Sequence, residues 1–207
     1  MSLLLIADYS GVFVFALTGA MLAARKEMDI FGFVVMALMP AVGGGTLRDL
    51  ILGQPVFWLS DTNYLFITIA AAVLTFFAVR LLARLNEIIV WLDALGLSVF
   101  CAIGASKAMS VTGDPVIGVM MGVMTAVAGG ILRDVIANEA PLVLHKEVYA
   151  TAAFAGSLTY VVLFDNVPSV ALVAGIVVSF IVRAMGIAFG LSLPAAKSEQ
   201  SGNNQGS

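Results

Sequence analysis

Charged side chains are scarce in this sequence. Asp, Glu, Lys and Arg together make up 11% of its 207 residues, against roughly 25% in an ordinary soluble domain. So few charges could not cover a surface that faces water. The composition therefore excludes an ordinary soluble protein.

Other absences narrow the range of functions. Cys101 and His145 are the single cysteine and the single histidine, which excludes an internal disulfide and an H-E-x-x-H zinc site. The net charge of −3 leaves no basic stripe for a nucleic-acid backbone. The glycine-rich segments lack the Gly-Lys-Ser/Thr ending of a phosphate loop. We therefore expect no enzymatic activity, no metal site, no cofactor and no nucleic-acid partner.

Hydrophobic residues are abundant instead. They make up 61% of the chain, and the mean hydropathy is +1.06. Because a helix needs about 20 apolar residues to cross a membrane, the sequence predicts an all-α membrane protein. We expect a single transmembrane domain over residues 1–193 and a disordered polar tail over residues 194–207. Seven spans are predicted: Leu3 to Ala24, Asp29 to Leu52, Thr62 to Leu82, Ile88 to Val111, Asp114 to Ala137, Val148 to Phe164, and Pro168 to Leu193.

The basic residues between the spans predict the orientation in the membrane. They gather on one set of turns, which includes Arg25, Lys26, Arg80 and Arg84. Loops rich in Lys and Arg stay on the cytoplasmic side. With seven spans the two ends of the chain lie on opposite sides. We therefore expect the amino terminus outside, the carboxyl terminus inside, and membrane lipid around the helices.

The sequence repeats itself at a separation of 85 positions. About 20 of about 52 positions, beginning with Asp8 and Asp93, are identical without a gap. Three spans, an odd number, separate equivalent points, so the two copies should enter the membrane from opposite sides. We therefore expect two inverted three-helix repeats, over about 3–82 and about 88–165, and a seventh helix over about 168–193.

The second and fifth helices are expected to kink or break at glycines. Pro40 has no amide hydrogen to bond the carbonyl four residues earlier, and Gly43-Gly44-Gly45 follows it. The fifth span carries Gly129-Gly130 at the equivalent place. A freed carbonyl in a membrane must be buried in protein or line a wet cavity, so a broken helix indicates a binding or permeation site. The alternative is that small residues only let two helices approach closely.

Leu-Arg-Asp follows both glycine motifs. In the first copy, Thr46 and Asp49 have the spacing of a capping box at the amino end of a half-helix. The second copy has Ile131 in place of the threonine, so its cap depends on Gly130 and Asp134 alone. We therefore expect an asymmetric pore or site.

The charges of these motifs lie inside apolar spans. An unpaired charge costs at least about 2.5–3.5 kcal/mol at the bilayer centre, so each needs a partner. Asp8 lies at the depth of Arg48, and the repeat gives Asp93 the same relation to Arg133. We predict these two local ion pairs. The alternative is that the pairs only hold the helices in place.

Two further charged positions each have two interpretations. Lys107 lies about one turn from the end of the fourth span, where a lysine extends to the interface or acts as a gating charge. His145-Lys146-Glu147 is typical of an anchor at the membrane surface. Its alternative is a titrating switch.

These features resemble prokaryotic members of the TRIC (trimeric intracellular cation) channel family. The resemblance rests on the arrangement of spans and on three motifs: Gly44-Gly45-Thr46-Leu47-Arg48-Asp49, its second copy Gly129-Gly130-Ile131-Leu132-Arg133-Asp134, and His145-Lys146-Glu147-Val148-Tyr149-Ala150. It covers the chain from Ala7 to about Gly190. It implies a homotrimer in the bacterial cytoplasmic membrane, each subunit with a potassium-permeable pore lined by the second and fifth helices. Bacterial relatives are also labelled glycine transporters.

Two functions follow from this resemblance and these motifs. The first is passive permeation of K⁺. The freed carbonyls and Asp49 or Asp134 would supply ligands for the ion or an electrostatic field that attracts it. The second is a carrier for a small zwitterion such as glycine, with its carboxylate facing a half-helix amino end or Arg48 and its ammonium meeting an aspartate. Inverted repeats with broken helices serve either function. The expected ion pathway consists of Gly44, Gly45, Thr46, Asp49, Gly129, Gly130 and Asp134.

Overall fold

The described part of the chain is helical. The computed structural model describes residues 3–78, 85–144, 148–165 and 167–192. The predicted disordered tail over 194–207 and the segment His145-Lys146-Glu147 lie outside the described residues. Within them the helices are α1 (Leu3–Arg25), α2 (Ile30–Ile51), α3 (Phe57–Ser60), α4 (Asn63–Ala78), α5 (Leu85–Thr112), α6 (Pro115–Ile136), α7 (Ala150–Leu163) and α8 (Pro168–Phe189), with a 3₁₀ turn, η2, at Leu142–Leu144.

Five of these helices are long and apolar enough to cross a membrane by length and composition: α1, α2, α5, α6 and α8. Two shorter apolar helices, α4 and α7, match the third and sixth predicted spans. The all-helical class is therefore confirmed, and the count of seven spans stays a prediction. The short α3 and η2 were not predicted. Each lies in the connection that follows α2 or α6.

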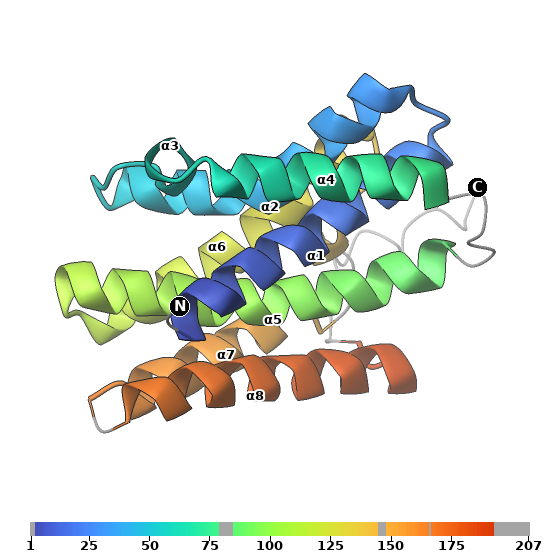
Figure 1. The fold of residues 1–207 in the computed structure, drawn as a ribbon. Helices are drawn as coiled ribbons and strands as arrows, with labels where there is room; N and C mark the ends of the chain where they lie inside the picture. The colour runs from blue at the N-terminus through green and yellow to red at the C-terminus, as the bar shows by residue number, and fades with distance from the viewer. Residues whose placement is uncertain (1–2, 79–84, 145–147, 166, 193–207) are drawn as a thin grey trace, which may run out of the picture.

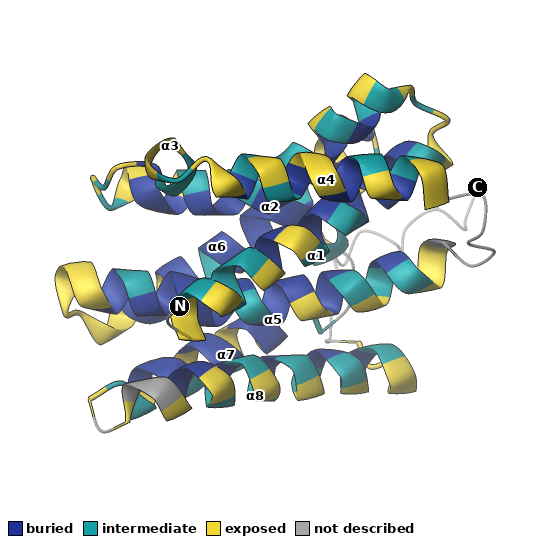
Figure 2. Cartoon of the chain, in the orientation of Figure 1, coloured by how far each residue is buried: buried dark blue, intermediate teal, exposed yellow. Residues whose placement is uncertain are grey.

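The helices form a bundle around α5. In Figure 1, α4 runs along one side of the bundle, α7 and α8 run along the opposite side, and α1 and α5 lie between them. α5 packs against α1, α6, α7 and α8. Figure 2 shows buried residues on the inward faces and exposed ones on the outer helices. Large apolar side chains such as Phe31 and Phe77 point outward, as expected of surfaces that contact lipid.

α2 and α6 begin and end in the same way. The Asp29 side chain caps α2 by accepting from the Gly32 amide, and Asp114 caps α6 in the equivalent manner. Just beyond their carboxyl ends, Gly53 has a φ of 63° and Asn138, 85 positions later, a φ of 54°. Glycine and asparagine tolerate this left-handed conformation best. Because the two helices begin and end at equivalent positions, both are 22 residues long.

The predicted break in α2 and α6 is wrong, because both helices are continuous from cap to cap. Pro40 lies inside α2 and still removes the amide partner of the Met36 carbonyl. That carbonyl lies against α1, where a Cβ on Gly19 would come within 1.9 Å of it. The freed oxygen is thus buried against a neighbouring helix, so the helix need not open. A kink within the continuous helices stays a prediction.

Gly44 and Gly129 let α2 and α6 cross with their backbones in contact. A Cβ on Gly44 would lie 2.2 Å from the carbonyl oxygen of Thr125, and one on Gly129 would lie 2.6 Å from that of Pro40. Thr125 is the repeat equivalent of Pro40, so the two contacts are exchanged by the same shift of 85 positions. Reciprocal contacts of this kind are expected when a two-fold axis relates two segments. The close-approach interpretation of these glycines is therefore confirmed.

Replacing Gly44 by alanine should destabilise the protein by about 1–3 kcal/mol, because the new methyl group meets a backbone carbonyl that cannot move aside. Gly43→Ala is the matched control. It makes the same gain in helix propensity, but its methyl group meets only the flexible end of Leu132. Thermal melts in detergent should show a clearly lower Tm for Gly44→Ala. Equal melting temperatures for the two variants would contradict the crossing contact.

Candidate functional site

A buried arginine and aspartate occupy the last turn of both α2 and α6. Arg48 Nε donates to Asp49 Oδ1 at 2.8 Å, and Arg133 Nε donates to Asp134 Oδ1 at 2.8 Å. These four residues are at most 4% exposed. Neighbours in a helix rarely face each other, so the sequence pattern did not predict pairing of adjacent residues.

The predicted capping box is wrong. Asp49 lies at the carboxyl end of α2, where the helix dipole disfavours a negative charge. The Thr46 hydroxyl donates to the Val42 carbonyl within the helix and accepts from the Trp58 indole. Because α2 does not break at the glycines, no amino end exists for Thr46 to cap.

The second oxygen of each motif aspartate binds the segment that follows its helix. Asp49 Oδ2 accepts from the Phe57 amide at 2.9 Å, and Asp134 Oδ2 accepts from the Leu142 amide at 3.2 Å. Phe57 begins α3 and Leu142 begins η2, again 85 positions apart. These donors offset the unfavourable dipole and fix α3 and η2 over the ends of the long helices.

The two clusters differ at the position of Lys107. Lys107 Nζ lies 2.8 Å from Asp49 Oδ1, and the lysine side chain is 30% exposed. Its repeat equivalent is Leu22, so Asp134 has no such partner among the described residues. Lys107 therefore does not simply extend to the membrane interface. It adds a second positive charge to the first cluster.

One of the two predicted inter-helix ion pairs is confirmed. Arg133 Nη1 lies 2.7 Å from Asp93 Oδ1, and it also donates to the Thr18 hydroxyl at 3.0 Å. The predicted pair of Asp8 with Arg48 is wrong, since no ion pair joins them within the described residues. Asp8 instead accepts a hydrogen bond of 2.8 Å from the Tyr64 hydroxyl.

Tyr149 is the repeat equivalent of Tyr64 but makes no equivalent hydrogen bond. Its hydroxyl and Asp93 Oδ2 are both buried without a hydrogen-bond partner in the described part of the chain. A Cβ on Gly130 would lie 2.8 Å from this hydroxyl. The tyrosines were missed at the sequence level, although their separation of 85 positions is a signal that could have found them.

Two cavities that are lined in part by charged side chains adjoin these clusters. The first has a volume of about 460 Å³ and the second about 270 Å³. Leu4, Leu5, Asp8, Arg48, Phe57, Tyr64, Ile103, Ser106, Lys107 and Ser110 line the first cavity. Leu22, Arg25, Asn86, Ile89, Val90, Arg133, Asp134, Glu139, Ala140 and Leu142 line the second.

The cavities lie at opposite ends of the bundle. Along α1, Asp8 and Leu22 are about 21 Å apart at about 1.5 Å per residue. Most lining residues of the second cavity are repeat equivalents of those of the first, as Leu142 is of Phe57. The two differ in extent. The first cavity reaches Asp8 and Tyr64, whereas the second ends at Arg133 and does not reach Asp93.

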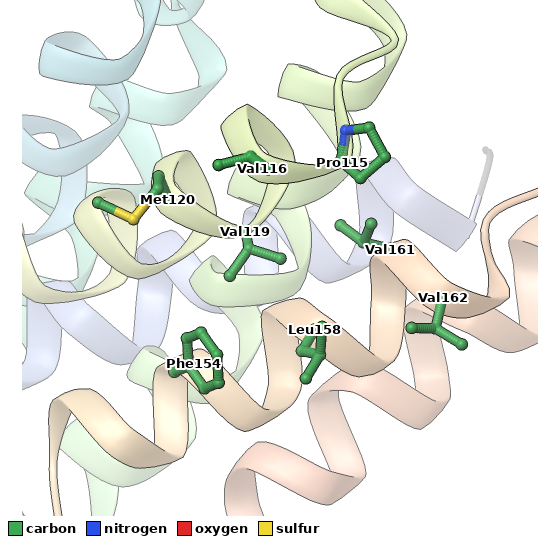
Figure 3. Close-up of a pocket in the computed structure, with 8 residues that line it drawn as sticks. All are labelled: Pro115, Val116, Val119, Met120, Phe154, Leu158, Val161 and Val162. Carbon is green, nitrogen blue, oxygen red and sulfur yellow. The ribbon is translucent and has the colours of Figure 1, made fainter.

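A third hollow lies between α6 and α7. Figure 3 shows Val116, Val119 and Met120 of α6 opposite Phe154 and Leu158 of α7, and no polar side chain lines the space. It therefore offers no ligand for an ion. Among the described residues, no group of three or more His, Cys, Asp or Glu side chains gathers in a way that could hold a metal ion.

Comparison with known proteins identifies the family. The family model described as "Glycine transporter" matches residues 5–80 and again residues 90–165. The chain is 43% identical to the "TRIC trimeric intracellular cation channel orthologue from Rhodobacter sphaeroides", with a TM-score of 0.89 over 92% of this chain and 100% of that one. It belongs to the prokaryotic TRIC channel family.

Other relatives agree with this TRIC membership. A "prokaryotic TRIC channel" solved in 0.5 M KCl is 31% identical, with a TM-score of 0.87 over 92% of this chain and 98% of that one. The "UPF0126 membrane protein" of Vibrio cholerae is 44% identical over 93% of this chain and 82% of its own length. The "UPF0126 inner membrane protein YadS" of Escherichia coli is 40% identical over 94% and 97%.

Replacing Asp49 by asparagine should lower the stability of this TRIC protein by about 3–5 kcal/mol, because Arg48 and Lys107 would lose their shared carboxylate. Denaturation in detergent measures the loss. Asp114→Asn is the control, since Asp114 is an exposed helix cap and asparagine caps about as well as aspartate. A loss no larger than that of the control would contradict the role of Asp49.

The turn between α3 and α4 should lose stability in acid. The Tyr9 hydroxyl donates to Asp61, and this bond, with that from the Asn63 amide, holds the pKa of Asp61 below its ordinary value. A lowered pKa in the folded state gives stability that is present at neutral pH and is lost as the pH falls through that pKa. The difference in Tm between wild type and Asp61→Asn should be present at pH 7 and shrink as the pH falls below the ordinary pKa of an aspartate, about 3.9. A difference that stays constant over this range would contradict it.

Proposed function

We propose that this protein is a passive, potassium-permeable cation channel with one pathway in each protomer. The observation that carries this proposal is the pair of equivalent polar cavities at opposite ends of the same helices. Membership of the TRIC family supports it, and so do the solved relatives that are named cation channels. The pathway would run from one cavity to the other past the crossing of Gly44 and Gly129.

The charged groups of the two cavities would control permeation. Asp49 and Asp134 would contribute negative charge near the two ends of the pathway, and Gly45, Thr46 and Gly130 lie about one helical turn from them. Arg48 already pairs with Asp49, so Lys107 gives the first cluster an excess positive charge and is the gating candidate there. Leu22 leaves Asp134 without an equivalent charge. The pathway would therefore be electrostatically asymmetric.

The remaining features of the proposal follow from sequence and family. The transmembrane domain over residues 1–193 consists of two inverted repeats and an additional helix, with the amino terminus outside and the carboxyl terminus inside. The protein lies in the bacterial inner membrane. The E. coli relative is named an inner membrane protein, which supports this location. It forms a homotrimer, as the word "trimeric" in the name of the Rhodobacter relative supports. No enzymatic activity is part of the proposal.

A carrier for glycine or a similar zwitterion is the second candidate. The first cavity is lined by the carboxylate of Asp8 together with the cations of Arg48 and Lys107. Opposite charges in one cavity suit a ligand that carries both an ammonium and a carboxylate group. The description of the matching family model also supports this candidate.

Recordings in planar bilayers separate the two candidates. In asymmetric KCl, a channel gives discrete conductance steps that reverse near the K⁺ equilibrium potential and do not require glycine. Electrically silent bilayers, together with saturable glycine uptake into proteoliposomes, would establish the carrier instead.

Exchanging the residues at the asymmetric position should change the conductance in opposite directions. Lys107→Met removes the cation beside Asp49 and should raise K⁺ conductance several-fold. Leu22→Lys places a cation at the equivalent position near Asp134 and should lower it. Single-channel recording at fixed KCl measures both. Changes in the same direction would contradict the proposed asymmetry.

A further inference from the structure

A further charged cluster of this TRIC protein lies at the exposed end of the second cavity. Arg25 Nη2 lies 3.2 Å from Glu139 Oε1, and Lys26 Nζ lies 3.1 Å from the same oxygen. Two positive charges therefore share one carboxylate. Arg25 and Glu139 both line the second cavity. The cluster joins the turn after α1 to the turn after α6, so it bridges the mouth of this cavity.

The backbone at the two helix ends fixes where these side chains begin. The Glu139 amide donates to the Asp134 carbonyl at 2.8 Å, and Asn138 between them has a φ of 54°. Glu27, just after α1, has the same φ, and the amide that follows it also bonds back into its helix. Both ends have the Schellman motif, which closes a helix with a left-handed residue. The charged cluster is therefore set by two ordered turns.

The first half has the same turn at its own cavity without these charges. The Gln54 amide donates to the Asp49 carbonyl at 2.8 Å, as the equivalent amide does after α6. Gln54 stands in the place of Glu139, and Ser110 lines the first cavity in the place of Arg25. The backbone of the turn therefore does not require a charged cluster, so the charges at the second cavity need another explanation.

Stability is not the main effect of this cluster. The side chains of Arg25, Lys26 and Glu139 are 33%, 34% and 29% exposed. Ion pairs that are this exposed contribute little to stability. They do act on mobile ions, because charges are felt over about 10 Å at 0.1 M salt. The larger effect of the cluster is therefore on ions that approach the second cavity.

We infer that Glu139 admits monovalent cations to the second cavity by offsetting the charges of Arg25 and Lys26. With the Glu139 carboxylate present, one positive charge is in excess at this mouth, and without it two are. A mouth with more positive charge repels cations more strongly. Asp134 also lines the cavity, but it is already paired with Arg133. The inference rests on the proposed permeation of cations, but the charge of the mouth is measured without any ion flux.

Thiol labelling in lipid nanodiscs at about 10 mM salt measures this charge. Cys101, which is buried, is replaced by alanine, and a single cysteine is placed at Asn86, an exposed residue of α5 that lines the second cavity. The readout is the labelling rate with a cationic methanethiosulfonate reagent divided by the rate with an anionic one. A change in the accessibility of the thiol alters both rates alike and cancels in this ratio.

Two single variants should shift the ratio in opposite directions. Glu139→Gln should lower it at least about fivefold, and Arg25→Gln should raise it by a similar factor, because they change the charge of the mouth by one unit of opposite sign. The double variant keeps the wild-type net charge and should restore the wild-type ratio. In about 1 M salt the differences should largely disappear, because charges are then screened within about 3 Å.

Matched controls separate this role from a purely structural one. Both single variants break the same ion pair, so loosening of the two turns would shift the ratio in one direction, and the double variant would not restore it. Gln54→Glu adds a carboxylate at the equivalent position of the first half, at the opposite end of the bundle. It should leave the ratio at Asn86→Cys unchanged.

Each outcome of the labelling decides the inference. Opposite shifts in the single variants, with restoration in the double variant, support the role of Glu139. Equal ratios in all variants, or shifts in the same direction, overturn it. Wild-type bilayers that stay silent while the ratios shift as expected would count against the cation channel and leave the role of Glu139 standing. Normal K⁺ currents with unchanged ratios would do the reverse.

Discussion

The buried arginine-aspartate pair in the last turn of α2 and of α6 is the interaction on which the rest of the structure depends. Each aspartate lies at the unfavourable end of a helix dipole and inside an apolar bundle. It is stable there because an arginine binds one oxygen and a backbone amide binds the other. The same carboxylate therefore anchors α3 or η2 over the end of a long helix.

The crossing of α2 and α6 holds these two charged ends in a fixed relation. Gly44 and Gly129 bring the helix backbones into contact, so no residue larger than glycine fits at this crossing. The equivalent capping of both helices gives them the same length, and the charged groups lie near the same distance from the crossing on either side. A symmetric frame of this kind supports either a continuous pathway or alternating access.

Differences at single positions make the charged clusters of the two halves unlike each other. Lys107 stands where the other half has Leu22, and Thr18 stands where the other half has Ile103. The first exchange adds a cation beside Asp49, and the second adds an acceptor for Arg133. α8 has no repeat equivalent, and its main contacts within the described residues are with α7 and α5 of the second half. The two cavities are therefore built from one plan but are lined by different charges.

The sequence by itself determined the helical class, the family and the repeat of 85 positions, because hydropathy and motif spacing are properties of the chain alone. It also predicted the pair of Asp93 with Arg133, since depth along a helix follows from residue number. It could not determine the partner of Arg48, which depends on which of several acceptors lies nearest once the helices have packed. Whether α2 stays continuous also depends on tertiary packing, because the Met36 carbonyl freed by Pro40 is buried against Gly19 of α1. Side-chain partners and the fate of a freed carbonyl depend on neighbours distant in sequence, and only the packed bundle supplies them.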